Sequence, residues 1–272
     1  MNSKKEKEHI ILSASRMTDM PKFYPEILIE EVNKRMDKNI HTLVLWTKHP
    51  KSLLVNPLFD FLMDLKSKGI QLYIQLTITG MGGTFIEPNA PMLEDSILLL
   101  PQVIELVGKP ERIRLRIDPI VKIEDKQGEI TTNIHHLPEI VERCSRLGIK
   151  TYSFSFLENK MHKKVNKRFD DLGLTILSPN QEEREKMVKW IHNIESDFGV
   201  NIYACAVPGI QSSACIDGEY LERLHDNSGL NTNHKQPFKR SLCGCSMSTD
   251  IGGFPPRKCF TGCIYCYGNA SR

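Results

Sequence analysis

The chain has 272 residues, of which 40% are hydrophobic and 25% are charged, a composition that fits a folded globular protein and excludes a disordered one. Lys and Arg exceed Asp and Glu by only 36 − 33 = 3, which is too small an excess to indicate binding to nucleic acid or membrane. No apolar run reaches the roughly 18 residues of a membrane span. Residues 1–8 are rich in Lys and Glu and no apolar segment follows them, so we expect a cytoplasmic protein.

Apolar, β-branched runs predict six strands, with amphipathic helical segments between them. The predicted strands cover residues 9–14, 41–46, 70–77, 112–118, 149–156 and 200–206. The predicted helices cover residues 25–36, 57–66, 92–107, 137–147, 179–198 and 218–225, and Pro101 should break or kink the third of them.

Strands that alternate with helices predict an α/β protein with a parallel sheet. Right-handed crossovers would curl six such units into a partial (β/α)6, TIM-like barrel, with an open doubly wound sheet as the alternative. No predicted strand is followed by a Gly-x-Gly-x-x-Gly or Walker sequence, so dinucleotide and P-loop binding lack their main support. We assign residues 1–206 to the barrel and 207–272 to a cysteine-rich iron–sulfur segment packed on it, because Gly, Ser, Asn and Pro become frequent after Cys205.

Several predicted strands end in polar side chains, and in parallel architectures the functional site gathers at these ends. Arg116 and Asp118 lie two residues apart on one face of their strand, so they can form an ion pair. Each such residue alone also fits a helix cap or a solvated loop, but together they predict a polar cavity. The side chains concerned are Arg16, Asp19, Trp46, Lys48, Thr77, Arg116 and Asp118.

Cysteine is the most informative residue type, because five of the eight cysteines fall in the last 30 residues. A disulfide framework is not expected in a cytoplasmic chain that is long enough to bury its own core. Cys259, Cys263 and Cys266 have Cys-x3-Cys-x2-Cys spacing, which can hold three corners of a [4Fe–4S] cluster and leave one iron open. A structural zinc site would need a fourth ligand, and neither Cys nor His occurs after Cys266.

The other five cysteines fall into two groups, a single cysteine in a predicted helix and four cysteines from Cys205 onward. Cys144 lies on the apolar face of a predicted helix, where we expect it to be part of the core. The other four belong to the segment that is poor in core-forming residues, and four thiols are what a closed metal site needs. We favour an auxiliary [4Fe–4S] cluster there, with structural zinc and free thiols as open alternatives. These four residues are Cys205, Cys215, Cys243 and Cys245.

The triad of cysteines, with Tyr265 immediately before the third, resembles the cluster motif of radical S-adenosylmethionine (SAM) enzymes. Nearly the whole chain is similar to the bacterial DUF1848 family, whose function is uncharacterised. The resemblance rests on the segments SASRMTDMPKFY (13–24), LWTKHP (45–50), LTITG (76–80), RIDPI (116–120) and CGCSMSTDIGGFPPRKCFTGCIYCYGNA (243–270). That family is described as carrying a radical-SAM-like cysteine cluster at its C-terminus, so the resemblance implies a [4Fe–4S] cluster and SAM and names no substrate.

Radical SAM enzymes normally carry this motif just after the first strand of their partial barrel, whereas here it lies at the C-terminus. We therefore expect a circular permutation, in which residues 246–254 act as the first strand and the N-terminal strand takes the second position. The superfamily's Gly-Gly-Glu-like element, which holds the SAM amino group at the end of that second strand, is missing. The corresponding region reads Ser15-Arg16-Met17-Thr18-Asp19, so Asp19 is the residue that would replace the carboxylate.

These features favour a radical SAM-type enzyme, in which a 5′-deoxyadenosyl radical abstracts hydrogen from a substrate inside the barrel. Arg16, Lys48 and Arg116 would face anionic groups. The resemblance implies an electron donor such as flavodoxin or ferredoxin, and leaves open whether the substrate is a small molecule or a macromolecule. The candidate catalytic residues are Arg16, Asp19, Lys48, Arg116 and Asp118, and the candidate cofactor contacts are Asp19, Trp46, Thr77 and Tyr265.

Two alternatives come from other classes of protein. The missing Gly-Gly-Glu element favours an iron–sulfur redox or sensor protein that does not cleave SAM. The basic stretches 160–167 and 234–240 suggest a zinc-stabilised nucleic-acid-binding module, but the net charge of only +3 and the absence of a nucleic-acid-binding motif argue against it.

Overall fold

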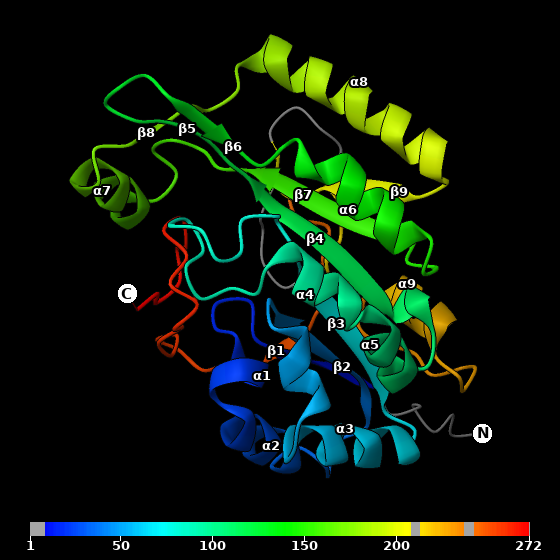
Figure 1. Ribbon diagram of the computed structural model, residues 1–272. Helices are drawn as coiled ribbons and strands as arrows, with labels where there is room; N and C mark the ends of the chain where they lie inside the picture. The colour runs from blue at the N-terminus through cyan, green and yellow to red at the C-terminus, as the bar shows by residue number, and fades with distance from the viewer. Residues whose placement is uncertain (1–8, 208–212, 237–241, 272) are drawn as a thin grey trace.

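A computed structural model describes residues 9–207, 213–236 and 242–271 of the chain (Figure 1). Its main feature is a parallel sheet of seven strands in the order β10-β1-β2-β3-β4-β7-β9. All six strands predicted from the sequence are confirmed, with ends that differ by at most two residues. The strands are β1 (Ile10–Ala14), β2 (Ile40–Thr47), β3 (Gln71–Thr77), β4 (Ile113–Ile120), β7 (Thr151–Phe156), β9 (Asn201–Ala204) and β10 (Thr249–Asp250).

The seventh strand, β10, comes from the C-terminal segment and pairs with β1 in parallel, with Leu12 opposite Thr249 and Ser13 opposite Asp250. This is the strand order that the permutation hypothesis predicts for residues 246–254, with the N-terminal strand in second place. The expected TIM-like barrel, however, is not shown. Within the described ranges the sheet is open, since β10 and β9 are its two edges and do not pair with each other.

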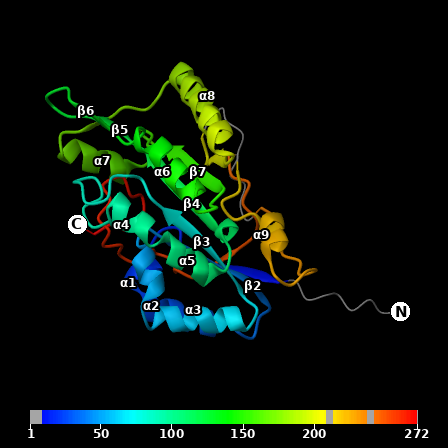
Figure 2. The ribbon, with the colours of Figure 1, turned by 45° about the vertical axis from the view of Figure 1, so that its right-hand side comes forward.

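One face of the sheet is covered by helices (Figures 1 and 2). Alternate residues of the strands, such as Leu43, Ile74 and Leu115, are fully buried there against the apolar sides of the helices. The helix predicted over residues 92–107 is two helices, because Pro101 lacks an N–H and sits in the first turn of the second one. The elements on this side are α1 (Met20–Phe23), α2 (Pro25–Asn33), α3 (Leu58–Ser67), α4 (Leu93–Leu98), α5 (Leu100–Val107), α6 (His136–Ser145), α8 (Gln181–Phe198) and the 3-10 turns Pro50–Leu54 and Pro110–Arg112.

The opposite face of the sheet, which we call the inner face, is covered by the C-terminal segment. Ile11, Val44, Trp46 and Tyr73 of this face form an apolar cluster with residues of that segment. Helix α9 (Gly218–Leu224), which the sequence predicts over residues 218–225, contributes to the same cluster. The residues that the segment adds are Cys215, Ile216, Leu221, Leu224 and Cys245, with Cys205, Tyr220 and Cys243 at the edge.

A small antiparallel sheet was not predicted. It consists of β5 (Lys122–Glu124), β6 (Ile130–Thr132) and β8 (Thr175–Ile176), and α7 (Lys163–Asp171) lies beside it. Its apolar residues form a third cluster that includes Ile264 and Tyr265 of the cysteine triad loop. The C-terminal segment, red in Figure 1, accordingly lies between α7 and α1. No helix in the described part of the chain is long and apolar enough to cross a membrane.

Candidate functional site

The loop of residues 259–266 is fixed by backbone hydrogen bonds on both sides. Ile264 donates to the carbonyl of Ile86 at 3.0 Å, and Asn89 donates to the carbonyl of Thr261 at 3.2 Å. Ser271 closes the loop by donating to the carbonyl of Cys259 at 2.8 Å. Ile86 and Asn89 belong to the connection that follows β3, so the loop is held at the end of the sheet where the parallel strands finish, the carboxyl end.

The three thiols of this loop lie near enough to one another to interact electrostatically. Cys263 is buried, and burial raises the pKa of its thiol to about 12, while Lys48 acts in the opposite direction. Cys259 and Cys266 are half-buried. Burial likewise raises the pKa of Cys266, and its neighbours include Arg168. A metal bound by Cys263 and Cys266 would therefore have to displace their protons.

Two glycines of the triad region allow close approaches that a side chain would block. Gly262 has φ +77° and turns the loop between the first and second cysteines. At Gly268 an added Cβ would lie 2.6 Å from the carbonyl oxygen of Met17 and 3.3 Å from the sulfur of Cys266. The loop is thus packed against the connection that follows β1, which is where the candidate residues Arg16 and Asp19 lie.

A buried carboxylate, Glu87, lies against the triad loop. Thr79 donates to its Oε1 at 2.7 Å and Lys48 forms an ion pair with the same oxygen at 3.1 Å. The hydroxyl of Tyr265, the aromatic residue before the third cysteine, also donates to Oε1. Lys48 and Tyr265, two of the predicted site residues, thus share one partner, whereas Glu87 was missed because it lies ten residues beyond the end of β3.

Asp19 is buried and connects the end of β2 to α1. Its carboxylate accepts from the hydroxyl of Thr47 at 2.9 Å, from the backbone N–H of Lys48 at 2.8 Å and from that of Lys22 at 3.2 Å. Burial raises the pKa of Asp19 to about 6, although these hydrogen bonds act in the other direction. The chain itself already uses both oxygens, so the role predicted for Asp19 toward a SAM amino group stays a prediction.

The remaining predicted residues gather on the inner face. The guanidinium groups of Arg16 and Arg116 lie over the ring of Trp46, with centroid distances of 5.4 Å and 4.9 Å. Arg116 forms the predicted ion pair with Asp118, and Ser155 donates to the same carboxylate. Thr77 is half-buried and lies opposite Arg116 in the register of β3 and β4. The predicted polar strand ends therefore do converge.

Four cysteines outside the triad also meet on the inner face. The sulfurs of Cys205 and Cys215 are 3.5 Å apart, and the backbone N–H of Cys215 donates to the sulfur of Cys245 at 3.2 Å. Cys243 packs against the same apolar cluster. Arg116 links this group to the polar strand ends, because its NH1 lies 3.3 Å from the sulfur of Cys215. By contrast Cys144 is fully buried among the helices, as expected for a core residue.

Several buried polar atoms on the inner face have no hydrogen-bond partner within the described part of the chain. An orphaned buried donor costs free energy, so such atoms indicate a place for a bound polar group or water. They include NH2 of Arg16, Oε1 of Gln75, Nε of Arg114 and Oγ of Ser153.

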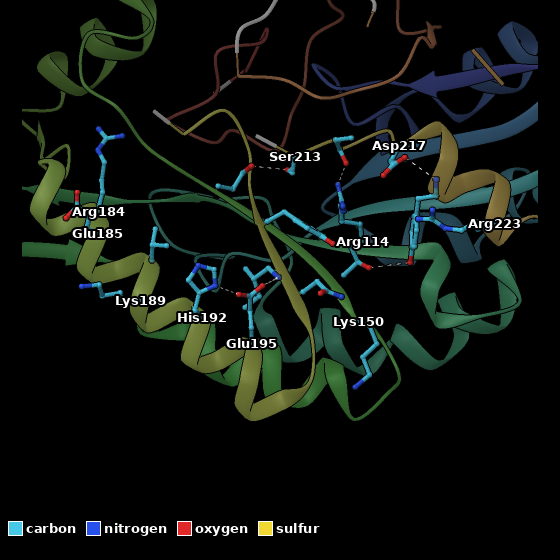
Figure 3. A pocket seen from close by; sticks show the side chains of 18 of the residues that line it. Arg114, Lys150, Arg184, Glu185, Lys189, His192, Glu195, Ser213, Asp217 and Arg223 are labelled. Carbon is cyan, nitrogen blue, oxygen red and sulfur yellow. Dashed lines mark hydrogen bonds and ion pairs between the residues drawn. The ribbon is translucent and has the colours of Figure 1, made fainter. Parts of the chain in front are cut away.

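A cavity of about 880 Å³ opens at the β9 edge of the sheet (Figure 3). Strand β9, helix α8 and the residues Ser213 and Asp217 line it. Its charged side chains are mixed, with Arg114, Arg184 and Arg223 among the bases and Glu185, Glu195 and Asp217 as the acids. The cavity contains none of the candidate catalytic residues.

The cysteine triad fits the group that the sequence implies by its chemistry rather than by a preformed ligand geometry. Within residues 9–207, 213–236 and 242–271, no three His, Cys, Asp or Glu side chains already surround one point as metal ligands. The chemistry of the triad nevertheless fits a cluster, since three thiols lie on one anchored loop, and Lys48 and Arg168 provide positive charge around them. Of the basic stretches, 160–167 falls largely on α7, while residues 237–240 of the second lie outside the described residues.

The fold and the site together define an α/β protein with an open parallel sheet and a cysteine loop at the strand ends. The chain belongs to the DUF1848 family, since the model of that family, described as "Domain of unknown function (DUF1848)", matches residues 34–268. Among solved structures it is similar to SuiB of Streptococcus suis, known from a crystal structure, with 10% identity and a TM-score of 0.35 over 85% of this chain. The chain spans 50% of SuiB, and a score this low carries no argument. No curated protein matches the chain.

Proposed function

We propose that the protein is a radical SAM-type enzyme whose open-iron [4Fe–4S] cluster is held by Cys259, Cys263 and Cys266. The observation that carries the proposal is the position of the triad loop. It is anchored at the carboxyl end of a parallel sheet, where Gly268 packs on Met17 after β1 and Tyr265 shares the carboxylate of Glu87 with Lys48, which follows β2. In parallel architectures this end is where ligands bind.

When bound, the cluster and SAM supply a reducing electron and a 5′-deoxyadenosyl radical. The chain's own residues would orient the two reactants and exclude water. Arg16 and Arg116 offer guanidinium groups to anionic parts of the ligands, and Trp46 offers a ring face. Ile264 and Tyr265 are packed into the third apolar cluster and would shield the sulfurs from solvent.

Glu87 is a stronger candidate than Asp19 for the carboxylate that binds the SAM amino group. Both oxygens of Asp19 already accept hydrogen bonds from Thr47 and from backbone N–H groups. The three donors of Glu87 all end on Oε1, and among the described side chains none donates to Oε2. Glu87 also contacts Tyr265 within the triad, so a ligand at the open iron would lie close to it.

The test is anaerobic reconstitution with iron, sulfide and a strong reductant, followed by assay for 5′-deoxyadenosine. We expect the wild-type protein to cleave SAM reductively. Cys263→Ala should show no cleavage and should bind about four fewer irons per chain. Cys144→Ala is the matched control, because Cys144 is a buried thiol that lies among the helices. Zinc at full occupancy and no SAM cleavage by the wild-type protein would refute the proposal.

An iron–sulfur redox or sensor protein is the second candidate, favoured by the internal hydrogen bonds of Asp19. Such a protein would bind the cluster and show no affinity for SAM. Calorimetric titration of SAM into cluster-loaded protein separates the two candidates. Glu87→Gln is the informative variant, because it should weaken SAM binding in an enzyme and leave the cluster content unchanged.

An acidic electron donor of the flavodoxin or ferredoxin type would find its basic contact on α7. Arg168 of this helix donates to the carbonyls of Ile264 at 2.6 Å and Cys266 at 3.0 Å, and Lys164 donates to that of Gly268. Lys163 and Lys167 on the same helix are exposed. A donor bound there would stand next to the triad, and reversing the charge of Lys163 and Lys167 should slow reduction in a salt-dependent manner.

A further inference from the structure

A second group of thiols, independent of the triad, is assembled on the inner face of the sheet. Its members come from three separate parts of the chain: Cys205 follows β9, Cys215 precedes α9, and Cys243 and Cys245 precede β10. The sulfurs of Cys205 and Cys215 are 3.5 Å apart, and Cys245 contacts the backbone N–H of Cys215. We propose that these four cysteines bind a second metal centre.

The backbone holds the two tail segments together at this point. Gly244 donates to the carbonyl of Ser213 at 3.2 Å, and Ser246 donates to that of Ile216 at 2.8 Å. The side chain of Gln75, on β3, donates to the carbonyl of Cys215 and so ties the pair to the sheet. The cysteines are therefore positioned by the fold itself rather than by chance proximity on a surface.

Positive charge lies next to these sulfurs. Arg116 donates to the sulfur of Cys215 at 3.3 Å. Arg114 is a second guanidinium close enough to Cys215 to act on it electrostatically. Four thiolates with either a zinc ion or a [4Fe–4S]²⁺ core carry a net charge of about −2, which nearby arginines can balance.

The unpartnered atoms of the inner face support the same conclusion. Arg114 and Arg16 each leave one buried nitrogen without a partner among the described residues, and both contribute to the charge around these cysteines. Buried guanidinium donors are rarely left without an acceptor. Sulfur ligands and sulfides of a metal centre are such acceptors, and hydrogen bonds of this kind tune the centre.

The one sulfur pair that is in contact, Cys205 and Cys215, has a spacing closer to that of two ligands of one metal ion than to that of a disulfide. All eight cysteines are free, and 3.5 Å is well beyond the roughly 2.05 Å of a sulfur–sulfur bond. Around a tetrahedral ion with metal–sulfur bonds of about 2.3 Å, neighbouring sulfurs would be about 3.8 Å apart. A larger iron–sulfur core would require the sulfurs to separate further, and glycine at position 244 lets the backbone between Cys243 and Cys245 adjust.

The centre would also explain how a segment poor in core-forming residues is held on the sheet. From Cys205 onward the apolar contacts with the inner face are few, and four of the eight residues that the segment gives to its cluster are the cysteines themselves. A metal bound by all four would join the end of β9, the start of α9 and the start of β10. Its role would be structural or electron-relaying, since no ligand position is left open.

The test compares the metal content of anaerobically purified wild-type chain with that of Cys215→Ser, Cys243→Ser and Cys144→Ser, measured by plasma mass spectrometry before and after iron–sulfide reconstitution. We expect Cys215→Ser and Cys243→Ser each to lose one zinc, or about four irons, per chain, and Cys144→Ser to lose nothing. Loss of zinc identifies a mononuclear centre and loss of iron a cluster. Either result supports the proposal.

A second readout keeps the test independent of folding and of the triad. Cys243 is only partly buried, so Cys243→Ser should retain the far-ultraviolet circular dichroism of the wild type while its C-terminal segment becomes sensitive to limited proteolysis. Cys263→Ser should lose the metal of the triad and keep the second centre. If folded Cys215→Ser and Cys243→Ser bind as much metal as the wild type, the proposal is wrong, whatever the activity toward SAM.

Discussion

Arg116 is the residue whose removal should reveal most about the inner face. It forms an ion pair with Asp118, donates to the sulfur of Cys215 at 3.3 Å and lies over Trp46 at 4.9 Å. The side chains of Arg116 and Asp118 are only 11% and 18% exposed, so water does little to replace either partner. Arg116→Met keeps the length of the side chain and removes the charge, and it leaves Asp118 as an unpaired carboxylate.

Breaking a buried pair by removing one partner costs about 3–5 kcal/mol of unfolding free energy, and the residual exposure of Asp118 places the expected cost of Arg116→Met near about 3 kcal/mol. Asp118→Asn should cost less, about 1–2 kcal/mol, because Ser155, Cys215 and Trp46 still contact the remaining groups. In the double variant no charge is left unpaired. The coupling energy of the cycle should therefore be about 1–3 kcal/mol.

The assay is equilibrium unfolding in urea at pH 7 and 25 °C under anaerobic conditions, for the wild type, both single variants and the double variant. Arg143→Met is the control, because Arg143 pairs with Glu94 at the surface and the side chain of Glu94 is 68% exposed. That variant should change stability far less. If the unfolding free energies lost by Arg116→Met and by Asp118→Asn add up to the loss of the double variant to within about 0.5 kcal/mol, the two side chains do not depend on each other and the reasoning is refuted.

Three further predictions concern the triad region. Burial holds the pKa of His49 at about 4, below the 6.5 of an unfolded histidine, so the neutral form of His49 stabilises the fold above pH 6.5. Between pH 7 and pH 5, the unfolding free energy of the wild type, measured in urea, should therefore fall by about 2 kcal/mol more than that of His49→Gln. Asp19 responds with the opposite sign, because its pKa of about 6 exceeds the ordinary 3.8. Its protonated form stabilises the fold at low pH, and this contribution is lost as the pH rises through about 6. Relative to the wild type, Asp19→Asn should therefore be more stable at pH 7 than at pH 5. Gly268→Ala would bring a Cβ within 2.6 Å of the Met17 carbonyl oxygen. The variant should therefore retain less iron after reconstitution and lose about 1–3 kcal/mol of unfolding free energy. If neither quantity changes, the packing described here is contradicted.

The strands of the main sheet were predictable because their residues are buried on both faces. β2, for example, is buried at all eight positions, and the apolar run Leu43–Trp46 at its centre, with β-branched Thr42 and Thr47 on either side, is typical of a buried strand. Helix α8 was predictable for a different reason, since Asn180 and Glu183 form a capping box at its start and Gly199 ends it in the left-handed conformation. Closure of the sheet was not predictable, because it depends on how the edge strands meet and not on any local pattern.

The small sheet and Glu87 could not be found in the same way. β5, β6 and β8 have only two or three residues each, too few to show a period. Glu87 follows Gly82 and Gly83 in a segment that looks like an ordinary polar loop. Its burial results from Thr79, Lys48 and Tyr265, which lie 8, 39 and 178 residues away along the chain. Only the folded structure shows that these residues surround one carboxylate.

The topology explains why the triad reaches the strand ends although it lies at the C-terminus of the chain. β10 runs parallel to β1, so the chain that leaves β10 emerges at the same edge as Arg16 and Asp19. It then needs only nine residues to reach Cys259, and on the way Arg257 and Lys258 are bound through their carbonyls to the hydroxyls of Thr18 and Tyr24. A strand placed beside β1 in parallel delivers a following loop to this edge whether it comes first or last in the sequence. Sheet position, and not sequence position, therefore decides which side chains the triad meets, and this is why Glu87 and Lys48 become its neighbours.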